Sequence, residues 1–316
     1  MSSRINFIVG MPRAGTTYLT KVLNNHPNIV CSGETLYYGR KFVTPNDSGN
    51  YSEKEVGMIF NNLINQSWDP KIINDAKPKI KKELDIYHAN ISKEVTVNTP
   101  LDVFGKVLCD IHNKEQFIEK TPHHIQYINR IKKYNPEAKF IALVRNPYTF
   151  MLSYKFQGQQ KNEVVRSIFE KIYHPISCAL VWRKNYNAIS TAKNNFPKDV
   201  LVIETEALKS NQTLADIQSF FYIKSPDLKP ITKDNSSFKN EVSKPVLEPI
   251  DYFWMNIIAG QQITAHLGQK TKSNASLSAI VKSLIQLPIV FFRFLNVLEV
   301  GKGQSKFQYL LGYLKR

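Results

Sequence analysis

Short apolar runs alternate with segments of helical periodicity along the first two thirds of the chain. The runs are rich in β-branched residues and stop at glycine or polar positions, which is typical of buried parallel strands. They cover residues 5–9, 29–31, 117–120, 139–144 and 199–203. Segments with apolar residues at helical spacing follow them, over 17–25, 124–134, 147–154, 163–195 and 208–221. Strands that alternate with helices predict an α/β fold with a parallel sheet flanked by helices.

Two regions depart from this alternation. Residues 46–100 are polar, with helical stretches near 53–65 and 79–94, and we interpret them as a helical insertion that covers the site. Beyond residue 270 the chain first becomes rich in Ser and Lys and then strongly apolar. We therefore expect a main domain over 1–269 and a linker with a helical, apolar and basic C-terminal tail over 270–316.

The apolar part of the tail, residues 280–300, allows two interpretations. It contains Pro288 and Arg293 and is too short to span a bilayer. From residue 274 to 316 there are six Lys and Arg but one acid, Glu299. The segment is then either a helix docked on the domain or on a second subunit, or an interfacial segment that makes peripheral contact with an anionic membrane.

The charge of the chain is strongly basic, with 42 Lys and Arg against 26 Asp and Glu and a net charge of +16. Such a field attracts polyanions, anionic membrane surfaces or multiply charged small ligands. Zinc-finger spacing is lacking, and no basic patch is interleaved with aromatic residues in the way that RNA-binding proteins show. We therefore expect no specific nucleic-acid partner.

The cysteines and the N-terminus bear on the compartment. Cys31, Cys109 and Cys178 are odd in number and far apart, which disfavours a disulfide framework or a metal site and fits a reducing compartment. The chain runs from Met1 directly into the first apolar strand, without the pattern of a signal peptide. We expect a cytoplasmic protein that uses no metal.

A glycine loop follows the first predicted strand. Gly10 to Thr17 reads G-M-P-R-A-G-T-T, the spacing of a nucleotide P-loop, but Thr16 stands where a P-loop has its lysine. The loop amides and the dipole of the next helix suit an anion. Without the lysine that neutralises a triphosphate, the loop suits a smaller 5′ group, and Arg13 offers a planar fork to its oxygens.

A second motif follows the strand at 139–144. Arg145-Asn146-Pro147 is followed by Ser153, and together with the loop this resembles the sulfotransferases that use 3′-phosphoadenosine 5′-phosphosulfate (PAPS). The resemblance implies that Arg13, Ala14, Gly15, Thr16 and Thr17 hold the 5′-phosphosulfate, and that Arg145 and Ser153 hold the 3′-phosphate. It extends more weakly through 200–221 and to a later loop at 235–238 and 244–245.

Glu34 is the candidate general base. It follows the second strand, and together with His26-Pro27 and Thr35 it resembles the tyrosylprotein sulfotransferases, whose Glu-Thr pair carries the base. The alternative is that Glu34 caps a helix or pairs with Arg40.

Lys120 is the candidate cation, because family members use a lysine near this position to contact the bridging oxygen. The alternative is an exposed lysine at the end of a strand. His123 and His124 are the second candidates for the base, since cytosolic relatives take a histidine from a Lys-Thr-His segment where this chain has Pro122.

The resemblance implies sulfuryl transfer from PAPS to an acceptor hydroxyl. A carbohydrate or glycolipid hydroxyl is favoured and a peptide tyrosine stays open, while the oligomeric state is left undetermined. A P-loop kinase is one alternative, which Thr16 disfavours and which leaves Arg145 and Ser153 unexplained. A non-catalytic protein that binds anions or membrane surfaces is another, which gives Glu34 and Lys120 no role.

Overall fold

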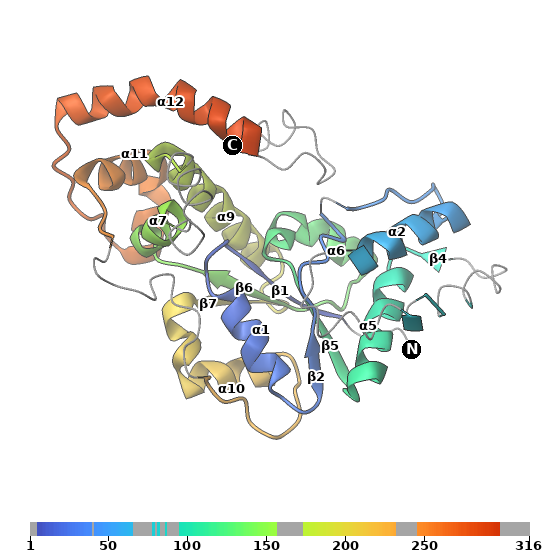
Figure 1. The fold of residues 1–316 in the computed structure, drawn as a ribbon. Helices are drawn as coiled ribbons and strands as arrows, with labels where there is room; N and C mark the ends of the chain where they lie inside the picture. The colour runs from blue at the N-terminus through green and yellow to red at the C-terminus, as the bar shows by residue number, and fades with distance from the viewer. Residues whose placement is uncertain are drawn as a thin grey trace. The chain divides into compact units, whose positions relative to one another are not determined.

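The structure is a computed structural model of the 316-residue chain (Figure 1). It describes residues 5–39, 41–65, 78–79, 81–82, 86, 95–156, 173–231 and 245–297, except the side chains of 64–65 and 291–297. The chain divides into two compact units. The first unit consists of Met1–Gly10, Gly15–Leu143 and Ala192–Ile231, and the second of Met11–Ala14, Val144–Thr191 and Thr232–Arg316.

The first unit is built on a five-stranded sheet in the order β2-β5-β1-β6-β7. Its strands are β1 (Asn6–Gly10), β2 (Ile29–Cys31), β5 (Gln116–Lys120), β6 (Phe140–Val144) and β7 (Val200–Glu204). The pairs β2–β5, β5–β1 and β1–β6 are parallel. All residues of β1, β2 and β6 are buried, as expected for strands covered on both faces. The predicted α/β class is confirmed, and each predicted strand is found within one residue.

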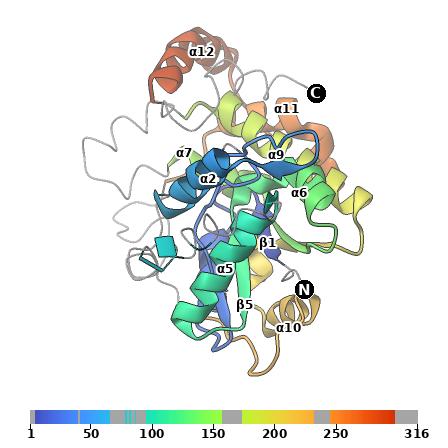
Figure 2. The ribbon, with the colours of Figure 1, turned by 90° about the vertical axis from the view of Figure 1, so that its right-hand side faces the viewer.

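Helices pack on this sheet within the first unit (Figure 1). They are α1 (Thr16–Asn24), α5 (Thr99–His112), α6 (Ile128–Tyr134) and α10 (Asn211–Phe220), with short 3₁₀ helices η1 (Pro122–Tyr127) and η3 (Thr205–Lys209). Helix α1 contacts β1 and β2, and α5 contacts β2 and β5. Helix α2 (Glu53–Asn65) packs on α5 (Figure 2), near a small antiparallel sheet of β3 (Asn50–Tyr51) and β4 (Val95–Thr96).

Several elements differ from the sequence prediction. The helix predicted over 124–134 begins as η1, and α6 starts only at Ile128. Helix α5 was not predicted, although Leu101, Phe104 and Leu108 recur in it at helical spacing. A Cβ at Gly105 would lie 2.5 Å from Cδ1 of Phe117, so tight packing on β5 requires the glycine.

Other predictions fall partly or wholly outside the described residues. The predicted helix over 79–94 is described at only a few positions. The helix predicted over 163–195 is described from residue 173 onward, and it begins only at Pro175, because residues 173–174 are not helical. The loop at 235–238 lies outside the described residues, and so does Lys244.

The second unit holds helices α7 (Pro147–Lys155), α11 (Pro249–Leu267), α12 (Leu277–Val297) and most of α9 (Pro175–Asn195). Lys155 Nζ lies 2.9 and 2.8 Å from the carboxylate oxygens of Asp251, whose side chain is fully buried. Asp251 also closes a capping box with Glu248 at the start of α11. This ion pair joins α7 to α11.

Helix α12 is docked on the second unit through one of its faces. The carbonyl of Ser283 lies 3.0 Å from Nε2 of His174, and Trp254 Nε1 donates to Ser283 Oγ at 2.9 Å. The predicted helical tail is therefore present through Val297. No helix in the described part of the chain has the length and apolar character needed to cross a membrane.

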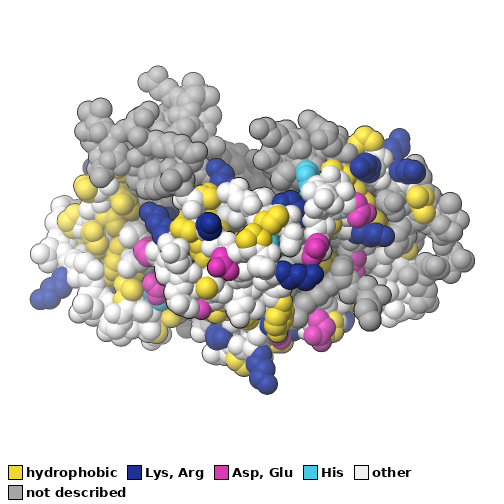
Figure 3. Space-filling view, turned by 90° about the horizontal axis from the view of Figure 1, so that it is seen from below, with side chains coloured by type: hydrophobic (Ala, Val, Ile, Leu, Met, Phe, Trp, Pro, Cys, Tyr) yellow, Lys and Arg dark blue, Asp and Glu magenta, His cyan; other side chains and the backbone are white. Residues whose placement is uncertain are grey.

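Charged side chains are dispersed on the face shown in Figure 3. Among the described residues on that face, Lys and Arg lie scattered between Asp, Glu and uncharged side chains rather than in one basic patch. Cys31, Cys109 and Cys178 are free and buried. Burial raises the pKa of the Cys31 thiol to about 12 and that of Cys109 to about 11, so both stay protonated near neutral pH.

Candidate active site

The carboxyl ends of three parallel strands meet at one edge of the first unit's sheet. In the strand register Ile8 of β1 is the partner of Lys120, and Ile118 is the partner of Cys31. Three segments begin at this edge. They are the glycine loop after β1, residues 32–35 after β2 and the segment that follows β5. Open α/β sheets bind ligands at such an edge.

The turn from β1 to α1 depends on two glycines. Gly10 has φ +134°, and a Cβ there would lie 2.3 Å from the carbonyl oxygen of Leu143, so only glycine lets β1 end so close to β6. Gly15 has φ +87° and is the N-cap of α1, which has no side-chain capping bond and no acidic residue in its first turn. The positive end of α1, starting at Thr16 and Thr17, therefore has the properties of an anion site.

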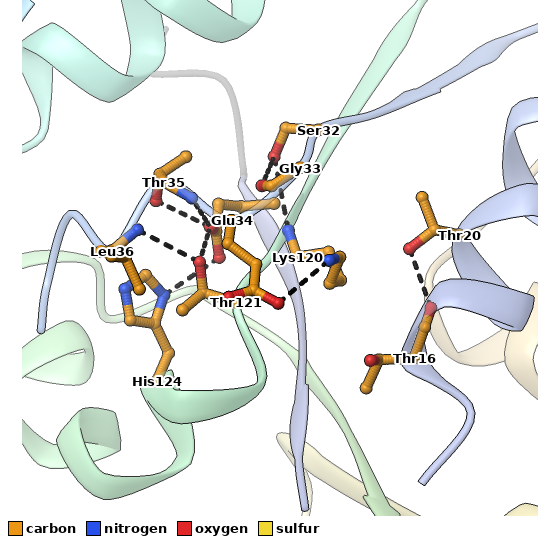
Figure 4. A network of polar contacts seen from close by, with 11 residues as sticks. Thr16, Thr20, Ser32, Gly33, Glu34, Thr35, Leu36, Lys120, Thr121 and His124 are labelled. Carbon is orange, nitrogen blue, oxygen red and sulfur yellow. Dashed lines mark hydrogen bonds and ion pairs between the residues drawn. The ribbon is translucent and has the colours of Figure 1, made fainter. Parts of the chain in front are cut away.

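Glu34 and Lys120 form an ion pair at the sheet edge (Figure 4). Lys120 Nζ lies 3.4 Å from Glu34 Oε1. The Glu34 side chain is 50% exposed, whereas that of Lys120 is 10% exposed. The partner of Glu34 is thus Lys120, and Arg40 lies outside the described residues. An exposed carboxylate beside an ammonium group can accept a proton while the cation faces developing negative charge.

Directly behind this pair lies a fully buried carboxylate, Glu119. Its Oε1 accepts hydrogen bonds from Thr35 Oγ1 at 2.7 Å, from the Thr35 amide at 3.3 Å and from Thr121 Oγ1 at 2.5 Å. Its Oε2 lies 3.0 Å from Nδ1 of His124. Burial alone would raise the pKa of Glu119, but the charge of His124 and these hydrogen bonds outweigh burial and hold it below the usual range.

The Glu119 contacts join the two segments that carry Glu34 and Lys120, and the partners Thr35, Thr121 and His124 are labelled in Figure 4. Thr35 follows Glu34 in the chain, and Lys120 follows Glu119. The Leu36 amide also donates to Thr121 Oγ1 at 3.3 Å, and the Lys120 amide donates to Ser32 Oγ at 3.4 Å. The relative position of Glu34 and Lys120 is therefore set by buried polar contacts on both sides.

The two histidines after Lys120 are placed differently. His124 is fully buried and engaged with Glu119, so it cannot reach an acceptor as the chain is folded here. His123 is partly exposed, with its ring 5.5 Å from that of Tyr127. Glu34 is thus the more accessible candidate base.

Glu119 is the residue that sequence reasoning missed. The available signal was a carboxylate next to Ile118 inside a predicted buried strand, since buried charges require partners.

In the second unit the Arg145 motif is bonded to the loop residues. Arg145 Nη1 donates to the Arg13 carbonyl at 2.6 Å, and Arg13 Nε lies 3.4 Å from Oγ of Ser153. Trp182 Nε1 donates to the Arg145 carbonyl at 2.9 Å. Burial lowers the pKa of the Arg13 guanidinium, against an opposing effect of Tyr173. This unit therefore brings together Arg13, Ala14, Arg145 and Ser153.

The start of α7 explains the Asn-Pro of the motif. Asn146 Oδ1 accepts from the amides of Tyr148 and Thr149 at 3.0 and 3.3 Å, which caps the helix. Pro147 occupies the first helical position, where it costs no hydrogen bond. Arg145 Nε in turn donates to Thr149 Oγ1 at 3.2 Å, so the capped turn also positions the guanidinium.

The solved structures that resemble this chain include three bacterial sulfotransferases of low sequence identity. A sulfotransferase from Alicyclobacillus acidocaldarius has a TM-score of 0.48 and 15% identity. The match covers 86% of this chain and 98% of that protein. The sulfotransferase domain of the curacin biosynthetic pathway has a TM-score of 0.47 and 19% identity. The match covers 90% of this chain and 98% of that domain. A sulfotransferase from Mycobacterium avium has a TM-score of 0.39 and 13% identity. The match covers 96% of this chain and 79% of that protein.

Comparison with known sequences gives a family. A search of curated proteins finds no match to the chain. A family model described as "Sulfotransferase family" matches residues 6–221, which is well over half of the chain and contains both motifs, Glu34 and Lys120. The chain belongs to the sulfotransferase family.

Proposed function

We propose that the protein transfers a sulfuryl group from PAPS to an acceptor hydroxyl, with Glu34 as general base and Lys120 as the cation beside the reacting group. The observation that carries this proposal is the pair itself. In a member of the sulfotransferase family, an exposed carboxylate lies 3.4 Å from a lysine at the carboxyl edge of the parallel sheet.

The donor site is assigned to consecutive residues of the loop and to the second motif. Arg13, Ala14, Gly15, Thr16 and Thr17 would hold the 5′-phosphosulfate, and Arg145 with Ser153 the 3′-phosphate. The glycine turn, the N-terminus of α1 without a capping side chain and the hydrogen bond from Arg145 to Arg13 support this assignment. A lysine-free loop also fits a donor without a γ-phosphate.

The proposed reaction is an in-line displacement at sulfur. The acceptor oxygen forms a bond to sulfur and loses its proton to Glu34, while the bond between sulfur and the bridging phosphate oxygen breaks. The products are the sulfated acceptor and 3′-phosphoadenosine 5′-phosphate. Lys120 would offset the negative charge that grows on the leaving phosphate.

The positive charge in this proposal comes from Lys120, Arg13 and Arg145, so the proposed reaction involves no metal. Within the described ranges, no three His, Cys, Asp or Glu side chains gather in a way that could hold a metal ion.

The acceptor is the least determined part of the proposal. A carbohydrate or glycolipid hydroxyl is our first choice, with a peptide tyrosine as the alternative. The net charge of +16 would attract an acidic acceptor of either kind. The cytoplasmic location expected from the sequence stays a prediction.

Transfer of labelled sulfur from PAPS tests the function. The purified protein is offered glycans, glycolipids and tyrosyl peptides, and we expect label to appear on one of these acceptors. Glu34→Gln should lower kcat by about 10²–10⁴-fold, because a general base is lost, while the affinity for 3′-phosphoadenosine 5′-phosphate stays the same. His123→Ala serves as the matched control. If Glu34→Gln retained normal turnover and His123→Ala lost it, the base would be His123.

A further inference from the structure

Exposed apolar side chains are concentrated on helix α12. Of the ten large hydrophobic residues that are exposed in the described part of the chain, five lie on this helix. Their exposures range from 46% to 76% for Leu277, Val281, Leu284, Ile285 and Ile289. The spacing of four, three, one and four residues places all five on one side of the helix. We call these five residues the apolar face of α12.

The side of α12 that carries Ser283 is bonded to the second unit, so the apolar face points outward. Ser283 is 6% exposed and contacts His174 and Trp254 of the same unit, while Ile280 and Leu287 next to it are only partly exposed. The apolar face therefore cannot turn into this interface without breaking both contacts of Ser283. An ordered helix with one docked face still exposes a continuous apolar stripe to the surroundings.

The charged residues around the apolar face of α12 are basic. Lys282 is exposed on α12, and Lys272 is exposed on the segment that leads into it, whereas the side chain of Lys270 lies against Gly260 of α11. Between 277 and 297 the sequence contains Lys282 and Arg293 and no acidic residue. An apolar face bordered by lysines, whose stems lie along apolar surface while the ammonium groups reach phosphates, is typical of helices that lie in the plane of a membrane surface.

We propose that the apolar face of α12 docks the protein on anionic lipid surfaces, with Lys282 and Lys272 toward the lipid phosphates. The occupant is a bilayer surface rather than a second copy of the chain, because a second copy would bring the same uncompensated positive charge to the contact. The helix lies on the membrane and does not cross it. This inference is independent of the proposed sulfuryl transfer.

Flotation with lipid vesicles tests the inference. The full chain is mixed with phosphatidylcholine vesicles that contain or lack phosphatidylglycerol. We expect it to bind the anionic vesicles, and the bound fraction to fall as salt is raised. The double variant Leu284→Ser with Ile285→Ser should bind at least about tenfold more weakly, since two buried aliphatic side chains are lost from the contact. Lys282→Glu should weaken binding to anionic vesicles alone.

The control is Met58→Ser, which removes an exposed apolar side chain from α2 in the first unit and should leave vesicle binding unchanged. The thermal midpoint and the circular dichroism spectrum show whether the double variant is folded. Wild-type protein that stays unbound to anionic vesicles would overturn the proposal, and so would a folded double variant that binds as well as wild type. Concentration-dependent dimers in light scattering, abolished by the double variant, would instead assign the face to a second copy.

Discussion

The fully buried carboxylate of Glu119 connects the two segments that carry the candidate catalytic pair. Burying a charge is costly unless it is paired and hydrogen-bonded, and Glu119 satisfies both requirements through Thr35, Thr121 and His124. The same bonds connect the residue after Glu34 to the residue before Lys120. Stability and the geometry of the candidate catalytic pair therefore depend on one side chain.

Glu119→Gln should lower the free energy of unfolding by about 1–3 kcal/mol, because it removes the buried carboxylate that accepts hydrogen bonds from Thr35 and Thr121 and lies 3.0 Å from Nδ1 of His124. Urea denaturation at neutral pH measures the difference. Glu115→Gln is the matched control, since Glu115 pairs with Lys224 at 3.1 Å but both side chains are largely exposed, and it should cost less than about 1 kcal/mol. Similar losses for the two variants would show that the buried network contributes no more than a surface pair.

The acid limb of the stability curve gives a second test of Glu119. Its folded pKa lies below the value of about 4.3 that a glutamate has in an unfolded chain. Its contribution is therefore fully present above about pH 4.3 and is lost as the pH falls through the folded pKa. We expect the stability difference between wild type and Glu119→Gln to be largest near neutral pH and to shrink in that acidic range. A difference that stays constant down to the acid transition would contradict the ionised state assigned to Glu119.

Arg145→Ala should weaken binding of 3′-phosphoadenosine 5′-phosphate by about ten- to a hundredfold, the usual value of a charge-assisted hydrogen bond. Titration calorimetry measures this affinity. Because Arg145 also bonds to Arg13, the variant could loosen the loop itself. ADP, which lacks the 3′-phosphate, separates the two effects. An equal loss for both ligands would assign Arg145 to loop support rather than to the 3′-phosphate.

Among the elements, β1 and β6 approach each other so closely at Gly10 that a side chain there has no room. A Cβ would meet the Leu143 carbonyl oxygen at 2.3 Å and its amide nitrogen at 2.6 Å. The end of β1 and the loop that follows it are thus fixed against the neighbouring strand. Any shift of this contact would also move the first residues of the loop.

Gly10→Ala should cost roughly 2–6 kcal/mol in stability, from backbone strain together with the displacement of a packed strand. The matched control is Gly49→Ala, because Gly49 has a positive φ of +81° but no atom within 4 Å of the added Cβ. That variant should lose only about 1–2 kcal/mol. Thermal unfolding of both proteins gives the comparison, and equal losses would mean that the close approach of β1 and β6 is not a constraint.

The end of the 46–100 segment is bound to the chain that follows Glu34. Tyr37 donates its hydroxyl to the Val97 carbonyl at 2.6 Å, and Tyr38 donates to Asn98 Oδ1 at 2.6 Å. Arg130 in α6 donates to the Tyr38 carbonyl at 2.8 Å. Residues 97–98 therefore support the backbone behind the candidate base. The expectation that the rest of the segment covers the site stays a prediction.

Strands were more predictable from the sequence than helices. A strand buried on both faces leaves a continuous apolar run, which β1, β2 and β6 show, whereas in β5 only Phe117 and Ile118 precede the charged Glu119 and Lys120. Helix α5 was missed although its apolar residues recur at helical spacing, whereas α11 is mostly apolar around its circumference and shows no such period. The capping box at Glu248 and Asp251 was the available indication for α11.

At the scale of the whole molecule, the family could be identified from the glycine loop and the Arg145-Asn146-Pro147 motif, because these motifs must occur in order at the ends of two strands. The Glu119 network was not predictable in the same way. Its four members are spread from Thr35 to His124, and only folding brings them together. The motifs indicate the family of the chain, whereas the tertiary contacts determine how the segment that carries the candidate base is held.

We propose that the chain binds a 3′-phosphorylated nucleotide. A shift in thermal stability on ligand binding tests this proposal most directly. The purified protein is heated with 3′-phosphoadenosine 5′-phosphate, with ADP, or with ATP and magnesium. A ligand at 100 times its dissociation constant stabilises the fold by about 2.7 kcal/mol. We predict a clear rise of the melting temperature with 3′-phosphoadenosine 5′-phosphate, and a much smaller rise with the other two. A rise with ATP and magnesium alone would contradict the account and favour a kinase.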